Sequence, residues 1–312
     1  MKALLSIVIP VYNRASLVCR CLESVHAQSL RPLHLIVVDN NSSDATPQVI
    51  SEWSATHADP SLKVTLLNQP MPGASAARAL GLEAVDTPYV YFFDSDDAMR
   101  PDAARAFADS FAKNPEAQIV AGKVQHHALD GSMRCHGRRG RNTLINHFHH
   151  SVLSTQAYAV STAFLREAGG WNPSLRIWDD WELGIRLLLR SPHVVWMNKV
   201  VADMYRQPDS VTGDLYSQRA RHYPDVIRAV RRVLQECDHP DRVRLLRLLH
   251  GREMMLAALY ALEERMDLAL PLRAKVLEET AADPYLRLIL RGAYAWRRKG
   301  LRGCDTWVTA LL

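Results

Sequence analysis

The sequence predicts an α/β domain at residues 1–215 and a C-terminal α-helical domain at residues 216–312, and two observations lead to this prediction. In the first domain, short and almost continuously hydrophobic runs alternate with longer runs whose apolar residues have helical spacing. Continuous hydrophobicity is typical of parallel strands that are covered on both faces of a sheet. From Tyr216 onward only the helical spacing recurs, with breaks at Asp238-His239-Pro240 and Asp283-Pro284.

Three of the hydrophobic runs are expected to be strands whose carboxyl ends lie side by side. They are residues 4–10, 33–38 and 89–93. Asn13, Asp39 and Asp94 follow these three runs closely. Because ligands of open α/β sheets bind beyond the carboxyl ends of the strands, the three side chains are expected to face one cleft.

Other segments complete the predicted order of elements. The list comprises helices at 15–28, from Pro72 to about Val85 and at 101–113, strands at 64–67 and 119–125, a turn at Asp130-Gly131, and helices at 226–234, 243–262, 266–279 and 285–299.

Charge is distributed unevenly along the chain. The 312 residues carry 38 Lys and Arg against 33 Asp and Glu, a net charge of +5. Residues 216–312 hold 18 basic and 12 acidic residues, so this domain has a net charge of +6 and residues 1–215 have −1. The basic domain is therefore expected to have a surface task of its own. A nucleic-acid partner is not expected, because the basic residues are not joined to a recognised reading motif.

The hydrophobic runs are too short to span a membrane. The longest one outside the predicted strands, Met254 to Leu262, has about nine residues, whereas a spanning helix needs roughly twenty. The first run meets Pro10 and lacks a small-residue cleavage site, so we interpret it as a strand. Five cysteines without CxxC or regular spacing fit a reducing compartment. We therefore expect a cytoplasmic location.

The most informative stretch is Asp94-Ser95-Asp96-Asp97, directly after a predicted strand. If the strand continues, Asp94 and Asp96 point to one side and Ser95 to the other. Crowded carboxylates repel one another, so the arrangement favours a divalent cation with a phosphate-bearing ligand. A solvated acidic turn at the end of a strand remains the alternative for this motif taken alone.

Four segments together resemble the family 2 glycosyltransferases, which have the GT-A fold. They are Ile9–Asn13, Val38–Asp44, Pro72–Arg78 and Phe93–Asp97, in this order and spacing. The resemblance covers about residues 4–215. It implies a nucleotide-diphosphate sugar donor, usually UDP-linked, that is bound with Mn²⁺ or Mg²⁺. It also implies sugar transfer with inversion at the anomeric carbon.

The same resemblance implies roles for individual residues. Asp39 matches the family's base-recognising aspartate, and a carboxylate is suited to accept a hydrogen bond from the ring N–H of uracil. Asp94 and Asp96 match the two acids of the DXD motif; Asp96 is the expected direct metal ligand, and Asp97 is a further candidate. The residues expected around the donor are Pro10, Tyr12, Asn13, Asp39, Arg78, Asp94 and Ser95. Arg78 could equally be a surface residue of its helix.

A second acidic segment, Trp178-Asp179-Asp180-Trp181-Glu182, begins a predicted helix. Acidic residues in a first turn interact favourably with the helix dipole, and this is the ordinary structural interpretation. The family's acidic motif falls here, however, and by resemblance Asp180 is the general base that deprotonates the acceptor hydroxyl. Asp179 stands where the family usually has Glu. A single displacement needs one base and one stabiliser of the leaving group.

Tyr205-Arg206-Gln207-Pro208 resembles the family's closing segment but lacks the histidine that often precedes the proline. Metal binding is therefore expected to be looser than in relatives. The implied acceptor is a glycan or a lipid-linked molecule in cell-surface polysaccharide synthesis. The helix at 285–299 is a candidate for peripheral membrane contact, although a basic helix packed on its neighbours fits equally well. A catalytically silent GT-A domain that serves as a binding or scaffold subunit is the alternative function.

Overall fold

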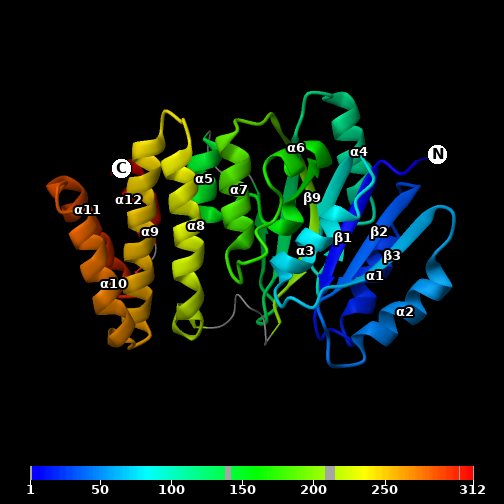
Figure 1. Cartoon of the computed structure of the whole chain (residues 1–312), viewed down its shortest axis with the longest axis horizontal. Helices are drawn as coiled ribbons and strands as arrows, with labels where there is room; N and C mark the ends of the chain where they lie inside the picture. The colour runs from blue at the N-terminus through cyan, green and yellow to red at the C-terminus, as the bar shows by residue number, and fades with distance from the viewer. Residues whose placement is uncertain (1, 138–141, 208–214, 302, 312) are drawn as a thin grey trace. The chain divides into compact units, whose positions relative to one another are not determined.

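The computed structural model describes residues 2–137, 142–207, 215–301 and 303–311 (Figure 1). The chain forms two compact units. The first comprises Met1–Thr143 and Ser151–Pro208, and the second comprises Leu144–His150 and Asp209–Leu312. The second unit therefore takes one short helix from within the predicted first domain. The predicted boundary at residue 215 follows 208–214, which lie outside the described residues, and it stays a prediction.

Within the described residues, nine strands form one mixed sheet in the first unit, in the order β3-β2-β1-β4-β8-β6-β9-β5 with β7 paired to β6. β1, β2, β3 and β4 run parallel, and β8 joins β4 in the antiparallel sense. The strands are β1 (Leu5–Val11), β2 (Leu33–Asp39), β3 (Leu62–Asn68), β4 (Tyr89–Phe92), β5 (Ala98–Met99), β6 (Ile119–His127), β7 (Met133–His136), β8 (Tyr158–Ser161) and β9 (Val194–Tyr205).

Helices flank this sheet and make up most of the second unit (Figure 1). Those of the sheet unit are α1 (Val18–His26), α2 (Thr46–His57), α3 (Ala74–Glu83), α4 (Ala103–Lys113), α6 (Thr162–Glu167) and α7 (Asp179–Leu189), with the 3₁₀ turn η1 (Thr155–Ala157). Those of the second unit are α5 (Thr143–His150), α8 (Tyr223–Glu236), α9 (Arg242–Leu262), α10 (Met266–Glu279), α11 (Pro284–Arg297) and α12 (Cys304–Leu311), with η2 (Tyr216–His222).

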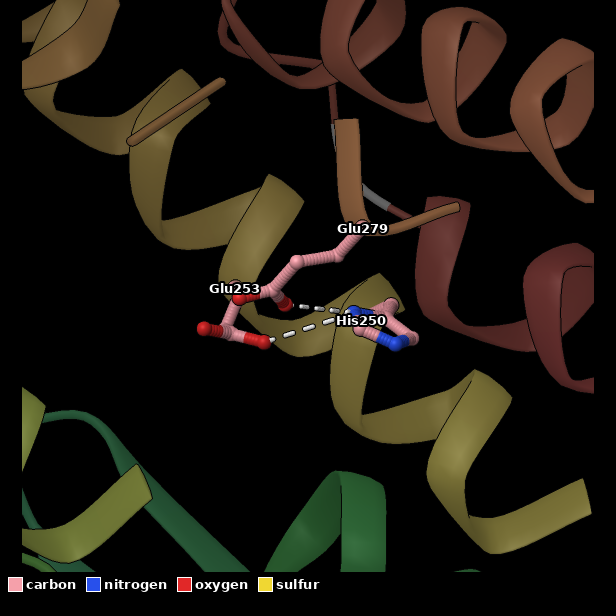
Figure 2. Close-up of side chains that lie close together, drawn as sticks. All are labelled: His250, Glu253 and Glu279. Carbon is pink, nitrogen blue, oxygen red and sulfur yellow. Dashed lines mark ion pairs between the residues drawn. The ribbon is translucent and has the colours of Figure 1, made fainter. Parts of the chain in front are cut away.

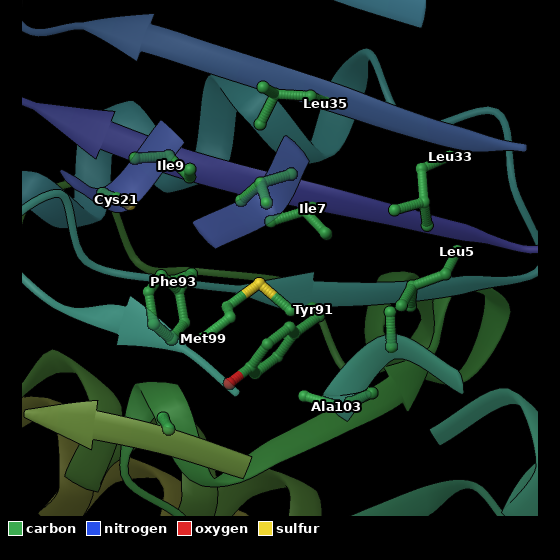
Figure 3. Packing of buried hydrophobic residues seen from close by; sticks show 14 of the residues in the cluster. Leu5, Ile7, Ile9, Cys21, Leu33, Leu35, Tyr91, Phe93, Met99 and Ala103 are labelled. Atoms are coloured by element: carbon green, nitrogen blue, oxygen red, sulfur yellow. The ribbon is translucent and has the colours of Figure 1, made fainter. Parts of the chain in front are cut away.

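The core of the sheet unit lies between the strands and their covering helices. Every residue of β1 and β2 is buried, which confirms the predicted strands covered on both faces. Figure 3 shows Ile7 and Leu35 from these neighbouring strands in one cluster with Tyr91, Phe93 and Met99. This rigid centre fixes the positions at which β1, β2 and β4 end.

The predicted α/β sheet with flanking helices and a helical C-terminal part is confirmed, but the prediction for the acidic motif is wrong in one respect. Strand β4 ends at Phe92, and Asp94 to Asp97 form a turn in which the Asp97 amide donates to the Asp94 carbonyl at 3.3 Å. Strand alternation therefore does not decide how Asp94 and Asp96 point. The predicted turn at Asp130-Gly131 is confirmed, because it joins β6 to β7 and these two strands pair in the antiparallel sense. Among the described helices, none is both long enough and apolar enough to cross a membrane.

Candidate functional site

Loops from neighbouring strands meet beyond the carboxyl ends of β1 and β2. Val11 and Asp39 are partners in the parallel register, so the loops that follow start side by side. The Asn13 amide donates to Ser42 Oγ at 3.0 Å, and Asn13 Oδ1 accepts from the Ser43 amide at 2.8 Å. Asn13 has a φ of 49°, a left-handed conformation that Asn tolerates better than most residues.

Asp39 is a buried carboxylate that is only partly satisfied. Its Oδ2 accepts from the Ser42 amide at 3.2 Å and from Asn68 Nδ2 at 3.3 Å. Its Oδ1 is buried and has no hydrogen-bond partner within the part of the chain that the structure describes. A buried acceptor without a partner costs free energy, so this atom is suited to take an N–H from a bound ligand. Asn68 was not singled out in the sequence analysis.

Asn40 shapes the loop between β3 and α3, a role that no feature of the sequence indicated. Its Nδ2 donates to the carbonyls of Gln69 and Met71, and its Oδ1 accepts from the Gly73 amide at 2.6 Å. Gly73 has a φ of 116°, which disfavours a side chain, and a Cβ there would lie 2.6 Å from Arg176 Nη1. The glycine thus lets Arg176 approach the start of α3.

Arg78 joins the two acidic segments of the sequence. It is 5% exposed, and it forms ion pairs of 2.6 Å with Asp94 and with Asp179. Its guanidinium also stacks on the ring of buried Trp171, 4.7 Å from the centroid. Arg78 is therefore not a surface residue of its helix, and its place beside the donor stays a prediction. It ties the turn after β4 to the beginning of α7.

A second buried side chain, Gln156, organises the carboxylates of the turn. Gln156 Nε2 donates to Asp94 Oδ2 at 2.6 Å and to Asp97 Oδ2 at 2.7 Å. Asp97 Oδ1 accepts from the Tyr205 amide at 3.0 Å, and Asp97 is 3% exposed. Asp97 is thus held inside the protein, and no pattern around Gln156 in the sequence indicated this contact.

Asp96, like Asp94, is only partly buried. Its carboxylate is partly exposed and lies 3.7 Å from Arg14 Nε. The Asp96 carbonyl accepts from Arg20, which also lies over the Tyr205 ring at 4.1 Å. Arg14 and Arg20 follow β1 in the chain, so this strand end brings positive charge to the acidic turn.

The three carboxylates of the turn lie close enough together to affect one another's protonation. Burial and the charge of Asp94 raise the pKa of Asp96 above its ordinary value. Burial and the charges of Asp94 and Asp96 raise the pKa of Asp97 well above its ordinary value. Carboxylate oxygens are the ligands that hard divalent cations prefer. The residues present therefore fit a bound Mn²⁺ or Mg²⁺ ion.

The other residues predicted around the donor take different positions. Pro10 and Ser95 are buried, whereas Tyr12 is 56% exposed. At the end of β9, the Tyr205 ring stacks on His127 with centroids 4.7 Å apart. The predicted closing segment continues into residues 208–214, which lie outside the described residues.

Asp180 lies in the first turn of α7. Trp178 occupies the N-cap position of this helix with a φ of 52°, and Asp180 Oδ1 accepts from the Trp181 amide at 2.8 Å. Burial and the adjacent charge of Asp179 raise the pKa of Asp180 to about 7, against the opposing effect of Arg78. A carboxylate with such a pKa is suited to general base catalysis near neutral pH.

A further group of potential metal ligands lies in the second unit, among α9 and α10 (Figure 2). His250 Nδ1 lies 3.6 Å from carboxylate oxygens of both Glu253 and Glu279. Arg231 and Lys275 already form ion pairs with these two glutamates. The two positive charges balance the two negative ones, so this group is an interhelical ion-pair network, and a cation would have to displace the basic side chains.

Comparison with known proteins agrees with this geometry. The model of glycosyl transferase family 2 matches residues 6–160, which contain β1, β2, β4, Arg78 and the acidic turn. Together with the mixed sheet, this match defines the class of the domain: a GT-A-like domain of the glycosyl transferase type. The chain belongs to glycosyl transferase family 2 through this domain.

Relatives and solved structures extend the comparison beyond residue 160. The minor teichoic acid biosynthesis protein GgaA of Bacillus subtilis (strain 168) is 25% identical over 195 residues, 59% of this chain and 43% of GgaA. S. aureus TarS 1-349 in complex with UDP-GlcNAc has a TM-score of 0.67 and 17% identity, covering 97% of this chain and 90% of that one. The mannosyltransferase PcManGT from Pyrobaculum calidifontis, in complex with GDP-Man and Mn²⁺, has a TM-score of 0.60 and 20% identity, covering 100% of this chain and 84% of that one.

The matches are low in sequence identity or cover only part of the relatives' length. At such identities the two solved structures show the shared fold. The chain spans less than half the length of the curated relatives that it matches, with GgaA at 43%. Activity, substrates and partners are therefore a matter for proposal.

Proposed function

We propose that the chain is an inverting, metal-dependent glycosyltransferase that moves a sugar from a nucleotide-diphosphate donor to a hydroxyl of a glycan or a lipid-linked acceptor. One observation carries this proposal: buried Arg78 joins Asp94 of the acidic turn to Asp179, the neighbour of Asp180. Arg78 thereby links the proposed cation-binding turn to the helix that carries the proposed base. The match to GgaA, a teichoic acid biosynthesis protein, supports a role in cell-surface polysaccharide synthesis.

The donor proposed is a UDP-sugar, and Asp39 is the residue proposed to recognise the base. The buried Oδ1 of Asp39 has no partner among the described residues, and uracil offers a ring N–H to such an acceptor. The TarS complexes with UDP and UDP-GlcNAc support the same choice. Tyr12, Asn13 and Ser95 are proposed to lie near the nucleotide.

Asp96 is proposed as the main holder of Mn²⁺ or Mg²⁺, with Asp94 and Asp97 as further candidates. When bound, the ion would supply positive charge that stabilises the departing nucleoside diphosphate. Within the chain, Gln156 keeps the carboxylates of Asp94 and Asp97 in place. Arg20 holds the Asp96 carbonyl, which orients the turn.

Asp180 is proposed to act as the general base. Its carboxylate takes the proton from the acceptor hydroxyl while the oxygen forms a bond to the anomeric carbon. The bond from this carbon to the diphosphate oxygen breaks on the opposite face, which inverts the configuration. Because the pKa of Asp180 is about 7, a large fraction of the protein holds this carboxylate deprotonated at neutral pH.

A thermal-shift panel of UDP, GDP and ADP, each with and without Mn²⁺, tests the donor site. We expect UDP with Mn²⁺ to raise the melting temperature most, because binding to the folded state alone stabilises it. Asp39→Asn keeps the size of the side chain but removes the charge, and it is expected to lower the preference for UDP. Equal shifts by all three nucleotides in the wild-type protein would refute the role of Asp39.

The alternative of a silent binding subunit is separated by a second assay. UDP release from a panel of UDP-sugars, with Mn²⁺ and glycan or lipid-linked acceptors, is expected for the wild-type protein. Asp180→Asn should bind UDP normally and lose roughly 10²–10⁴-fold of the release rate, the usual contribution of a general base. Normal UDP binding without release by the wild-type protein would favour the silent subunit.

A further inference from the structure

Helix α11 has one buried face that packs within the second unit. It contacts α9 and α12. Its buried residues are Leu286, Ile289, Leu290, Ala293 and Tyr294. Each lies on one side of the helix, because 3.6 residues make one turn.

The opposite side of α11 exposes large apolar residues in a row. Tyr285, Leu288 and Trp296 are 56%, 69% and 44% exposed. Helical geometry places exposed Arg291 on the same side, and Lys299 just beyond the end of α11. We call the exposed residues Tyr285, Leu288, Arg291, Trp296, Arg298 and Lys299 the α11 face.

Apolar exposure continues at the C-terminal end of this face. Leu301 is 43% exposed and Leu262, at the end of α9, is 47% exposed. A Cβ added to Gly300 would lie 4.0 Å from Leu262 Cδ1, so Leu262 adjoins the turn that follows α11. Large exposed apolar patches with polar surroundings mark interaction sites on proteins.

The charged residues of α11 and of the turn that follows it have a single sign. Residues 284–303 contain six Lys and Arg and no Asp or Glu. A second copy of the chain is a poor partner, because a twofold interface would bring two copies of this basic face together. A partner whose surface is negatively charged and whose interior is apolar matches the α11 face better.

We propose that the α11 face binds the surface of an anionic lipid bilayer. Leu288 enters the boundary between headgroups and acyl chains, Tyr285 and Trp296 lie at the interface with their polar atoms toward water, and Arg291, Arg298 and Lys299 pair with lipid phosphates. The helix lies along the membrane and does not cross it, which agrees with the lack of a spanning helix among the described residues. The proposal stands apart from the donor site and needs no nucleotide.

Co-sedimentation with vesicles of phosphatidylcholine, with and without phosphatidylglycerol, tests this proposal. The wild-type protein is expected to bind the anionic vesicles, and to bind them less as salt rises, because salt screens exposed charges. Leu288→Glu is expected to reduce the partition coefficient by roughly tenfold or more. The variant loses the leucine side chain that would enter the lipid, and it adds a negative charge. Replacing Arg291 and Lys299 by Gln is expected to cost about fivefold for each charge.

Val243→Glu is the matched control, since Val243 in α9 is 64% exposed and lies outside the α11 face. It should bind vesicles like the wild-type protein, and both Glu variants should melt at the wild-type temperature. Trp296→Phe should remove the fluorescence change that anionic vesicles cause. Absence of binding by the wild-type protein, equal binding to neutral vesicles, or equal loss in both Glu variants would each overturn the proposal. Self-association that Leu288→Glu abolishes, without vesicle binding, would overturn it in favour of a second copy.

Discussion

Asp180, the proposed base, has a carboxylate neighbour that raises its pKa. Burial first, and Asp179 second, raise its pKa to about 7. The base works only when deprotonated, so kcat/KM is expected to fall as pH decreases below about 7. Asp179→Asn removes a negative charge beside the base, and it should move this acid limb to lower pH.

A pH–rate profile of UDP release measures both effects. Arg78 loses an ion pair in Asp179→Asn, so the melting temperature of the variant must be recorded beside its profile. An acid limb at the same or a higher pH in a folded Asp179→Asn protein would contradict this account of Asp180.

Gln156 is expected to hold the acidic turn by donating to two carboxylates. Gln156→Ala should lower the free energy of unfolding by about 1–3 kcal/mol, because it leaves buried acceptors without a partner. Gln156→Glu should cost more at neutral pH, since it adds a third negative charge to Asp94 and Asp97. Urea unfolding at neutral and acidic pH measures both costs.

The two Gln156 variants serve as controls for each other. The difference between their free energies of unfolding should become smaller at acidic pH, because the carboxylates are then protonated and no longer repel one another. If Gln156→Glu is as stable as the wild-type protein at neutral pH, the amide is not needed to separate the acids.

At the level of elements, α3 depends on one glycine for its fit against the sheet. A Cβ at Gly81 would clash with Val8 Cγ1 and lie 3.2 Å from Val38 Cγ2. Gly81→Ala is therefore expected to destabilise the fold by about 1–3 kcal/mol through overpacking, although alanine favours helix formation. Unfolding by a chemical denaturant, followed by tryptophan fluorescence, measures this change in the free energy of unfolding.

Gly251→Ala in α9 provides the comparison. A Cβ there would meet Val308 Cγ1 at 3.4 Å, an ordinary contact, so this variant should be neutral or slightly more stable. Equal effects at both glycines would show that close packing of α3 on β1 and β2 is not the cause.

Elements with strong periodicity could be predicted from the sequence, and those that depend on distant partners could not. The pattern of residues 266–279 predicted α10 correctly, with Pro271 inside the helix. β9 was not predicted, although Val194–Tyr205 is a long strand. Its alternation of apolar and polar residues is broken by Asn198 and Lys199. Its pairing partner β6 lies about 70 residues earlier in the chain, so no local pattern indicates the pairing. β4 was predicted one residue too long, since the chain turns where carboxylates replace apolar side chains.

At the scale of the whole molecule, the site also combines features that local sequence patterns predict with features that depend on distant parts of the chain. That the loops carrying Asn13 and Asp39 meet could be predicted, because neighbouring parallel strands place their carboxyl ends together. That Asp94 faces the same cleft stays a prediction. Gln156 and Asn68 could not, because only the folded sheet brings them to Asp94 and Asp39. The roles of Asp96 and Asp180 stay predictions that rest on the family resemblance and on the geometry around Arg78.

The two proposed tasks fall in different units. The sheet unit holds the acidic turn and the proposed base, and the helical unit holds the α11 face. A variant of the α11 face should therefore keep its response to UDP and Mn²⁺, and Asp96→Asn should keep its binding to anionic vesicles. Loss of both properties in either folded variant would contradict this separation.

Titration calorimetry of UDP, with Mn²⁺ and then with EDTA in place of the metal, tests the central claim most directly. The acidic turn is predicted to hold the cation that binds the diphosphate, so the wild-type protein should bind UDP with Mn²⁺ and lose most of this affinity in EDTA. Asp96→Asn should bind UDP weakly under both conditions. Equal UDP affinity with Mn²⁺ and with EDTA, or wild-type affinity in Asp96→Asn, would contradict the account.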